Sequence, residues 1–163
     1  MIRMATEDDI PRILEIERDA ISPPWPHGAL LSEIYSDDSY FAVWDAGTVP
    51  ASNSPLGRGG SEADGVVFPV LGFIILRRVA DEGELFQIAI DAPHRRQGIA
   101  DRLMAASLDW AGINNINSIY LEVRKSNEAA ITLYTKHEFK QAGLRKEYFT
   151  DPVEDAIIMV NEK

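Results

Sequence analysis

Apolar residues recur at helical spacing from Ile10 to about Ala20, and Thr6 with the three acidic residues after it is typical of a helix start. Prolines within residues 22–26 end this helix, because proline lacks an N–H donor and restricts the residue before it. A second short helix is predicted over residues 28–35. The chain is therefore predicted to begin with a short strand at residues 2–4, which two helices follow.

Strands dominate the middle of the chain. Residues 40–44 and 70–79 are aromatic and branched, while residues 84–90 are nearly all apolar, as in a central strand that is covered on both faces. Residues 46–69 are rich in Gly, Pro, Ser and Asn, and we interpret them as one long, mobile hairpin loop. A single domain over residues 1–163 is expected, because this loop is too short to form a separate fold.

The second half alternates helices and strands. A helix is predicted from Gly98 to about Ala111, and its apolar residues are spaced for one buried face. The remaining elements are a strand at 119–123, a helix at 127–136 and a final hairpin of strands at 144–149 and 156–160. The order β-α-α-β-β-β-α-β-α-β-β predicts an α/β fold, a mixed sheet flanked by helices.

Composition places the chain among ordinary globular proteins, with 163 residues, 45% hydrophobic and 26% charged. No apolar run approaches the roughly 20 residues that a membrane span needs. The first residues lack the apolar stretch of a secretory signal. The sequence has no cysteine, which excludes disulfides, thiolate metal sites and a cysteine nucleophile. We expect a cytoplasmic enzyme or binding domain.

The net charge further narrows the function classes. The chain has 16 basic and 26 acidic residues, a formal charge of −10. Such an acidic surface argues against general nucleic-acid binding, which depends on neutralising phosphates. It suits a basic or amine-bearing substrate, although acidity can also serve solubility alone.

Residues 95–100, Arg-Arg-Gln-Gly-Ile-Ala, are predicted to join a buried strand to a helix. Free N–H groups at a helix start bind anions, and Gly98 removes a side chain where a phosphate would approach. Arg95 and Arg96 add charge and donors. The turn is a candidate diphosphate cradle, with an ordinary solvated turn as the alternative. It has neither the P-loop nor the dinucleotide-binding spacing.

Glu122 is a carboxylate in the middle of a predicted strand, on the face opposite to Leu121 and Val123. A carboxylate in this position is unfavourable unless it is paired or used chemically. It is therefore a candidate for a chemical role. The alternatives are an ion pair with Arg124 or Arg145, or an edge position that faces solvent.

Tyr134 is the third candidate for chemistry. Asn127 fits the N-cap of its helix, after which Ala130, Ile131 and Tyr134 fall on one stripe. An aromatic residue on such a stripe is usually part of the core, but a buried phenol still needs a partner for its hydroxyl.

Taken together, the chain resembles the GCN5-related N-acetyltransferase (GNAT) superfamily, and within it the bacterial ribosomal-protein-alanine N-acetyltransferases of the RimI type. Residues 95–100 resemble the acetyl-CoA motif (Gln/Arg)-x-x-Gly-x-(Gly/Ala), and the more specific match is residues 121–134, which resemble Leu-Glu-Val-Arg-x-Ser-Asn-x-x-Ala-Ile-x-Leu-Tyr. Further matches are residues 85–91, Ile16-Glu17, Pro24-Trp25 and residues 154–159.

The resemblance implies a GNAT fold and transfer of an acetyl group from acetyl-CoA to a protein N-terminus, most simply the terminal alanine of a ribosomal protein. It implies that Glu122 is the general base and Tyr134 the general acid. The residues that it implies for acetyl-CoA are Ile88, Ala89 and Ile90 along the acetyl-pantetheine arm, Arg95, Arg96, Gln97, Gly98, Ile99, Ala100 and Asp101 at the diphosphate, and Asn127 at the next helix.

The chemistry of these residues agrees with those roles. An α-amine titrates near 8, so it is mostly protonated at neutral pH, and a carboxylate can take its proton directly or through water. A backbone N–H at the splayed end of strand 84–90 can stabilise the oxyanion, and a tyrosine hydroxyl can protonate the leaving thiolate. No covalent enzyme intermediate is needed.

The chain departs from the family pattern in several places. His137-Glu138-Phe139 stands where Leu-Gly-Phe is usual, which predicts a different end for the preceding helix. Asp101 stands where a basic residue is common. Tyr148 and Phe149 resemble the aromatic pair near the acceptor groove, although two aromatics on a strand are more often packing.

Other functions remain open from sequence alone. One is acetylation of a lysine side chain or a small amine, and another is a sensor domain that binds acetyl-CoA without turnover. His27, His94 and His137 lack the spacing of metal ligands, so no metal is expected. A monomer without nucleic-acid or membrane partners is the simplest expectation.

Overall fold

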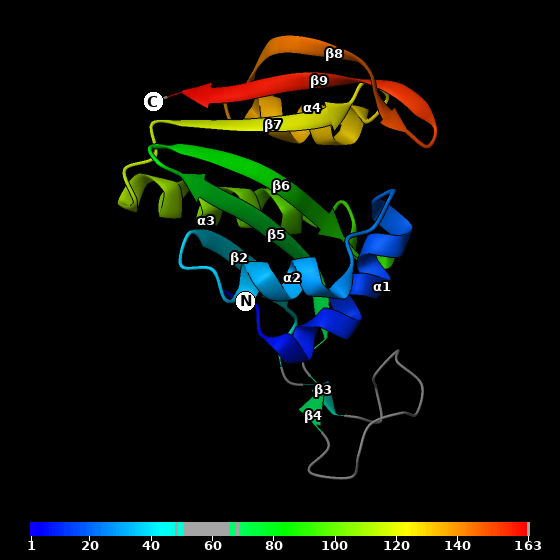
Figure 1. Ribbon diagram of the computed structural model, residues 1–163. Coiled ribbons are helices and arrows are strands. Elements are labelled where there is room, and N and C mark those ends of the chain that lie inside the picture. Colours follow the sequence, from blue (N-terminus) through cyan, green and yellow to red (C-terminus); the bar gives the residue numbers. More distant parts are fainter. Residues whose placement is uncertain (48, 51–65, 68, 163) are drawn as a thin grey trace.

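A seven-stranded mixed sheet forms the centre of the computed structural model, which describes residues 1–47, 49–50, 66–67 and 69–162. The strand order is β1-β2-β5-β6-β7-β9-β8, and only β6 and β7 pair in parallel (Figure 1). The strands are β1 (Ile2–Met4), β2 (Ser39–Asp45), β5 (Val70–Val79), β6 (Glu82–Ile90), β7 (Ser118–Arg124), β8 (Lys140–Thr150) and β9 (Val153–Glu162).

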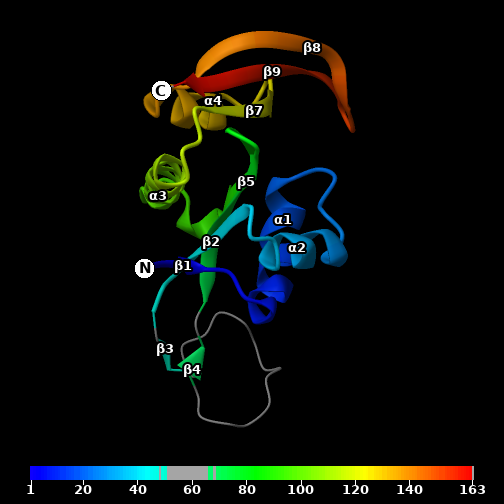
Figure 2. The ribbon, with the colours of Figure 1, turned by 60° about the vertical axis from the view of Figure 1, so that its left-hand side comes forward.

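Helices cover both faces of the sheet, as the turned view in Figure 2 shows. The helices are α1 (Ile10–Ala20), α2 (His27–Ile34), α3 (Ile99–Ile113) and α4 (Glu128–Lys136), with short 3-10 turns η1 (Glu7–Asp9) and η3 (Ala92–His94). Helices α1 and α2 pack on one face, and α3 and α4 pack on the other. This arrangement gives the chain two hydrophobic cores with the sheet between them.

Each core is built from the apolar stripes that the sequence predicts. Ile10, Ile13 and Ile16 of α1 are fully or almost fully buried against strands β2 and β5. Leu103 and Met104 of α3 fill the other side of the sheet. Each such side chain contributes about 1.5–3 kcal/mol when it is removed from water. The cores thus hold the central strands in a fixed position under the site.

The predicted order of helices and strands is confirmed, and the final two strands form the expected antiparallel hairpin. The structure adds two short strands, β3 (Val49–Pro50) and β4 (Val66–Val67), which pair antiparallel near the two ends of the predicted 46–69 loop. Most of that loop lies outside the described residues, so its mobility stays a prediction. β8 begins four residues earlier than predicted, at Lys140 rather than Leu144.

Helix α4 ends in a regular way without the family's glycine. Glu138 has a left-handed φ of 65°, and its N–H donates to the Thr135 carbonyl at 3.1 Å. The N–H of Phe139 donates to the Tyr134 carbonyl at 3.0 Å. These two bonds are the Schellman arrangement, in which glycine is usually preferred. The helix therefore ends in a Schellman arrangement with a glutamate, Glu138, in the left-handed position.

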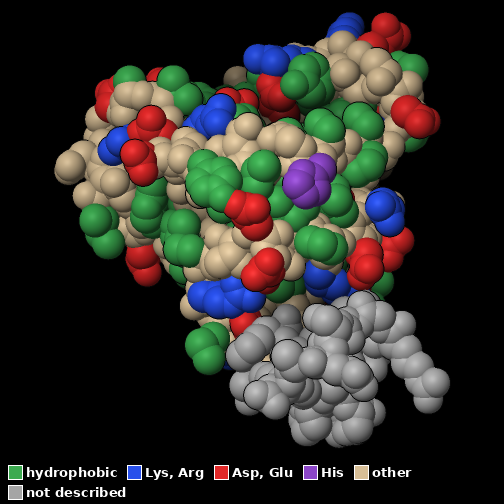
Figure 3. All heavy atoms as spheres, turned by 60° about the horizontal axis from the view of Figure 1, so that its bottom comes forward, with side chains coloured by type: hydrophobic (Ala, Val, Ile, Leu, Met, Phe, Trp, Pro, Cys, Tyr) green, Lys and Arg blue, Asp and Glu red, His purple; other side chains and the backbone are tan. Residues whose placement is uncertain are grey.

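The exposed surface mixes both signs of charge. On the face that Figure 3 shows, acidic and basic side chains are scattered among apolar ones rather than gathered in one patch. None of the helices in the described ranges is long and apolar enough to cross a membrane. Within the same residues, no group of three or more His, Cys, Asp or Glu side chains is placed to hold a metal ion.

Candidate active site

Strands β6 and β7 separate in the middle of the sheet. Their parallel pairing ends at Glu84 and Tyr120, whereas β6 stays paired with β5 as far as Ile90. The second half of β6 therefore has one edge without a strand partner in the described sheet. Backbone groups on such an edge are available to a ligand. The predicted splay of this strand is thus present, and it opens toward α3 and α4.

A tight turn after β6 leads into α3 and has the geometry of an anion site. Arg96 and Gly98 both have left-handed backbones, with φ of 62° and 78°. A Cβ on Gly98 would meet no heavy atom within 4 Å, so the space around this N-cap residue is open. The first helical bond runs from the Arg102 N–H to the Gly98 carbonyl at 3.2 Å, which leaves the earlier N–H groups without helical partners.

Side-chain contacts fix this turn to its neighbours. The Arg95 Nε donates to the Ile90 carbonyl at 3.0 Å. The Asp91 carboxylate receives Arg12 of α1 at 2.8 Å and the Nδ1 of His94 at 2.9 Å. These contacts fix the segment that leads into Arg96, whose left-handed backbone is of the strained kind that is common at functional sites.

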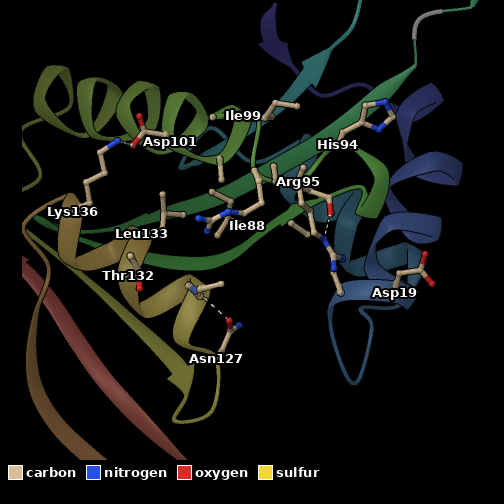
Figure 4. Close-up of a pocket in the computed structure, with 18 residues that line it drawn as sticks. Asp19, Ile88, His94, Arg95, Ile99, Asp101, Asn127, Thr132, Leu133 and Lys136 are labelled. Atoms are coloured by element: carbon tan, nitrogen blue, oxygen red, sulfur yellow. Dashed lines mark hydrogen bonds and ion pairs between the residues drawn. The ribbon is translucent and has the colours of Figure 1, made fainter.

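A cavity of about 610 Å³ lies along the opening (Figure 4). Ten of the residues predicted from the sequence to bind acetyl-CoA line this cavity. They are Ile88, Ala89 and Ile90 of β6, Arg95, Arg96 and Gly98 of the turn, Ile99, Ala100 and Asp101 of α3, and Asn127. Gln97 is the one predicted cofactor residue that does not line it. The Gln97 side chain is exposed and its amide donates to the Pro93 carbonyl at 3.4 Å.

Sequence reasoning missed the α4 wall of this cavity. Ala129, Ala130, Leu133 and Lys136 line it at helical spacing, together with Thr132 and with Asp19 and Ala20 at the end of α1. The repeat of about 3.6 residues along α4 was a usable signal, because one helix face points to one side. The same face begins at Asn127, whose Oδ1 caps the helix by accepting from the Ala130 N–H at 3.1 Å.

Glu122 lies beside the cavity rather than in its lining, on the half-buried face of β7. Its carboxylate forms an ion pair with Arg145 of β8 at 2.5 Å, one of the two pairings considered from the sequence. The Glu122 side chain keeps 23% of its surface exposed. The carboxylate is therefore paired and still accessible from outside.

Glu122 shifts the pKa of two more titratable groups on this surface. Burial, and then the nearby charge of Glu122, raise the pKa of Glu84 above its ordinary value. Interaction with the Glu122 carboxylate also raises the pKa of Tyr148. Glu84, Glu122, Arg145 and Tyr148 thus form one electrostatic group on β6, β7 and β8, and we call it the carboxylate cluster.

Tyr134 is buried on the inner face of α4, where its ring packs against Phe139 at a centroid distance of 5.9 Å. Burial raises the pKa of its hydroxyl far above the ordinary value, so the phenol keeps its proton. Like Glu122, Tyr134 does not line the cavity. The structure thus brings together ten of the predicted cofactor-binding residues in the cavity lining, whereas Glu122 and Tyr134, the two proposed proton-transfer residues, lie outside it.

Arg124 connects three separate segments next to the carboxylate cluster. Its guanidinium donates to the carbonyls of Asp151 at 2.7 Å, Pro152 at 3.0 Å and Ser22 at 3.4 Å. It also lies 4.3 Å from the centre of the Phe149 ring. The α1–α2 connection and the β8–β9 turn are thereby joined through one side chain of β7.

Comparison of the sequence with known protein families agrees with a ligand-binding site at the β6–β7 opening. Residues 10–139 match the acetyltransferase (GNAT) family, and the chain belongs to that family. The resemblance read from the sequence and the expected fold are both confirmed by this match and by the comparisons that follow.

Among individual relatives, the chain is similar to the ribosomal protein bS18-alanine N-acetyltransferase of Haemophilus ducreyi, with 31% identity over 98% of this chain and 97% of the relative. It is also 31% identical to the N-alpha-acetyltransferase of Sulfolobus acidocaldarius, over 97% of this chain and 89% of the relative. The crystal structure of the ribosomal-protein-S18-alanine N-acetyltransferase from Escherichia coli has a TM-score of 0.77 and 29% identity, covering 99% of this chain and 92% of that one.

Proposed function

We propose that this chain transfers the acetyl group of acetyl-CoA to the N-terminal α-amino group of a protein, with the terminal alanine of a ribosomal protein as acceptor. The observation that carries the proposal is the cavity at the β6–β7 opening, which runs from the anion turn of α3 along the apolar edge of β6. That shape suits a ligand with a phosphate end and a long uncharged arm. The names of two whole-length relatives support the N-terminal acceptor.

The residues of this chain fit acetyl-CoA. Unpaired N–H groups at the start of α3, with Arg95 and Arg96, suit the diphosphate, and the open space at Gly98 admits it. Ile88 and Ile90 give the uncharged arm an apolar wall, and Asn127 lies at the opposite wall. When bound, acetyl-CoA supplies an activated acetyl thioester.

Glu122 is the residue to which we assign the general-base role. An α-amine near neutral pH is mostly protonated and must lose a proton before it is nucleophilic. The Glu122 carboxylate can accept that proton, directly or through water, once the Arg145 guanidinium releases it. The acceptor ammonium and Arg145 then compete for the same carboxylate.

Tyr134 is assigned the general-acid role. Burial keeps its hydroxyl protonated over the whole neutral range, so it has a proton to donate to the leaving thiolate. Unpaired N–H groups on the edge of β6 are suited to stabilise negative charge that develops on the acetyl oxygen.

The test uses two peptides of otherwise equal sequence. One begins with a free alanine and has no lysine, and the other has a blocked N-terminus and one internal lysine. We expect coenzyme A release with the first peptide only, together with a mass gain of one acetyl group at its N-terminus. Acetylation of the blocked peptide alone would replace the proposal with a lysine acetyltransferase. Calorimetric binding of acetyl-CoA without turnover of either peptide would favour a sensor.

A further inference from the structure

Lys136 ends the α4 face that lines the cavity. Its Nζ lies 2.7 Å from the Oδ1 of Asp101, in the first turn of α3, next to the anion turn. Figure 4 shows the Lys136 side chain reaching from α4 to Asp101, at the opposite end of the cavity from His94 and Asp19. An ammonium group is therefore held at the edge of the site by a carboxylate on the facing helix.

Asp101 places a negative charge close to the proposed phosphate site. Its negative charge sits in the helix turn whose N–H groups would otherwise attract an anionic ligand, so an unpaired Asp101 would repel a phosphate. Two side chains from the end of α4 approach the same Oδ1, Lys136 at 2.7 Å and the His137 Nε2 at 2.9 Å. Both interactions lower the pKa of Asp101.

The two partners of Asp101 differ in freedom of movement. The Lys136 side chain is 64% exposed, whereas that of His137 is 14% exposed. His137 is also fixed by its backbone, since its carbonyl accepts from the Asn161 side chain at 2.9 Å. Lys136 can therefore leave Asp101 while His137 remains as its hydrogen-bond partner. Exposed ion pairs contribute little, which makes this exchange inexpensive.

We propose that Lys136 binds a phosphate group of the coenzyme and exchanges its carboxylate partner for that phosphate when the ligand enters. The terminal phosphate monoester of the coenzyme carries more negative charge than Asp101, and its diphosphate carries two charges over four free oxygens, so either group is the better partner for an ammonium group. The cation that the first turn of α3 lacks is thus supplied by the last turn of α4. This inference rests on the proposed function only in taking coenzyme A as the ligand.

The experiment measures coenzyme A binding by calorimetry, without an acceptor, for Lys136→Met, Lys136→Arg and the matched control Lys140→Met. Lys140 is an exposed lysine of β8 outside the cavity. For Lys136→Met we expect the Kd of coenzyme A to rise about fivefold or more at low salt, the size of one lost charge-assisted contact. Lys136→Arg and Lys140→Met are expected to stay within about twofold of the unchanged protein.

Two truncated ligands identify the phosphate. Pantetheine has no phosphate, so its Kd should not respond to Lys136→Met. If 3′-dephospho-coenzyme A loses affinity in the variant as coenzyme A does, the bound group is the diphosphate. If it does not, the bound group is the terminal phosphate. Both results support the role of Lys136.

A purely structural role for Lys136 predicts a different result. Lys136→Met would then lower the Tm of the free protein and leave the Kd of coenzyme A unchanged, and that pair of results would overturn the proposal. The failure of the proposed function is separate, because in that case the unchanged protein binds coenzyme A but acetylates no N-terminus. Absence of any coenzyme A binding by the unchanged protein would overturn both.

Discussion

The carboxylate of Glu122 on β7 and the guanidinium of Arg145 on β8 form an ion pair of 2.5 Å across the strand β9 that separates them. More than half of the Arg145 side chain, 54%, is exposed, and its guanidinium also lies 5.4 Å from the centre of the Tyr148 ring. The proposed general base is thus paired with an exposed cation. An acceptor ammonium must replace Arg145 before Glu122 can take its proton.

Replacing Arg145 with Gln should therefore help the acceptor to bind. An exposed ion pair is worth about 0.2–1 kcal/mol, so removing the competitor should lower the KM for an Ala-initiated peptide by no more than about fivefold. The measurement is the initial rate against peptide concentration at saturating acetyl-CoA. Arg145→Lys, which keeps the charge, should retain most of the original KM. A rise in KM for Arg145→Gln would mean that Arg145 binds the acceptor instead of competing with it.

Glu122→Gln and Tyr134→Phe remove the two groups to which we assign proton transfer. Each should lower kcat about 10²–10⁴-fold, the usual range for losing a general base or acid, and leave the Kd of coenzyme A nearly unchanged. Both substitutions preserve size, so the fold should persist. Glu82→Gln and Tyr35→Phe are matched controls, because both residues are exposed and neither lines the cavity. Full activity in both test variants would refute the assigned roles.

Arg124 should influence the acceptor and not the coenzyme. Its contacts with Ser22, Asp151 and Pro152 need the planar, forked guanidinium, and lysine cannot form all of them together. We expect Arg124→Lys to raise the peptide KM about tenfold, the cost of roughly one charge-assisted hydrogen bond. Arg78→Lys, at an exposed pair with Asp38, serves as the control. A change in coenzyme A affinity alone would contradict this interpretation.

Most of the fold could be predicted because its signals are local. Proline and periodicity define α1, and the branched run from Val70 to Val79 matches β5 at both ends. β8 was harder, because it is an edge strand with almost every residue exposed, so it has no alternation of apolar and polar positions to read. The short pair β3 and β4 gives no usable pattern in two residues each.

The candidate site also has one part that local sequence signals predict and another part that depends on contacts between distant segments. The residues of β6, its turn and the start of α3 lie close together in the sequence, so local motifs predicted nearly all of those that line the cavity, and Gln97 was predicted but does not line it. The contacts of Lys136 with Asp101 and of Arg124 with Ser22 depend on which segments the fold brings together. In each contact the two residues are too far apart in the sequence for a local pattern to predict it. For Glu122 the sequence offered two possible ion-pair partners, Arg124 and Arg145. Only the register of β8 against β9 selects Arg145.

Glu138 offers a gain in stability at the end of α4. It is exposed and holds a left-handed φ of 65°, which costs a non-glycine residue about 1 kcal/mol. Glu138→Gly should therefore raise the free energy of unfolding by about 0.5–1 kcal/mol and the Tm by roughly 1–4 °C. Denaturant and thermal unfolding measure both. Glu138→Ala removes the same carboxylate without relieving the backbone, so an equal gain from alanine would assign the effect to charge instead.

The buried carboxyl group of Glu17 predicts that the stability of the protein depends on pH, because its neighbours offset only part of the effect of burial. It is fully buried, and its carboxylate oxygens have no close hydrogen-bond partner among the described residues. Burial has a larger effect on its pKa than the weaker interactions with the Gln87 side chain and the Trp25 backbone, which lower it. Burial raises the pKa of Glu17 above its ordinary value. For an acid with a raised folded-state pKa, the stabilisation is complete below the unfolded pKa of about 4.3 and is lost as the pH rises through the folded value.

Glu17→Gln should remove that loss, because the amide is neutral at every pH and has nearly the same shape. We expect the Tm of the variant minus that of the unchanged protein to increase from pH 5 to pH 8, by about 2–4 °C for each kcal/mol recovered. Glu15→Gln, an exposed neighbour on α1, should give a difference that is flat with pH. A Glu17→Gln difference that is constant or falls over this range would show that the buried carboxylate is satisfied in its charged form.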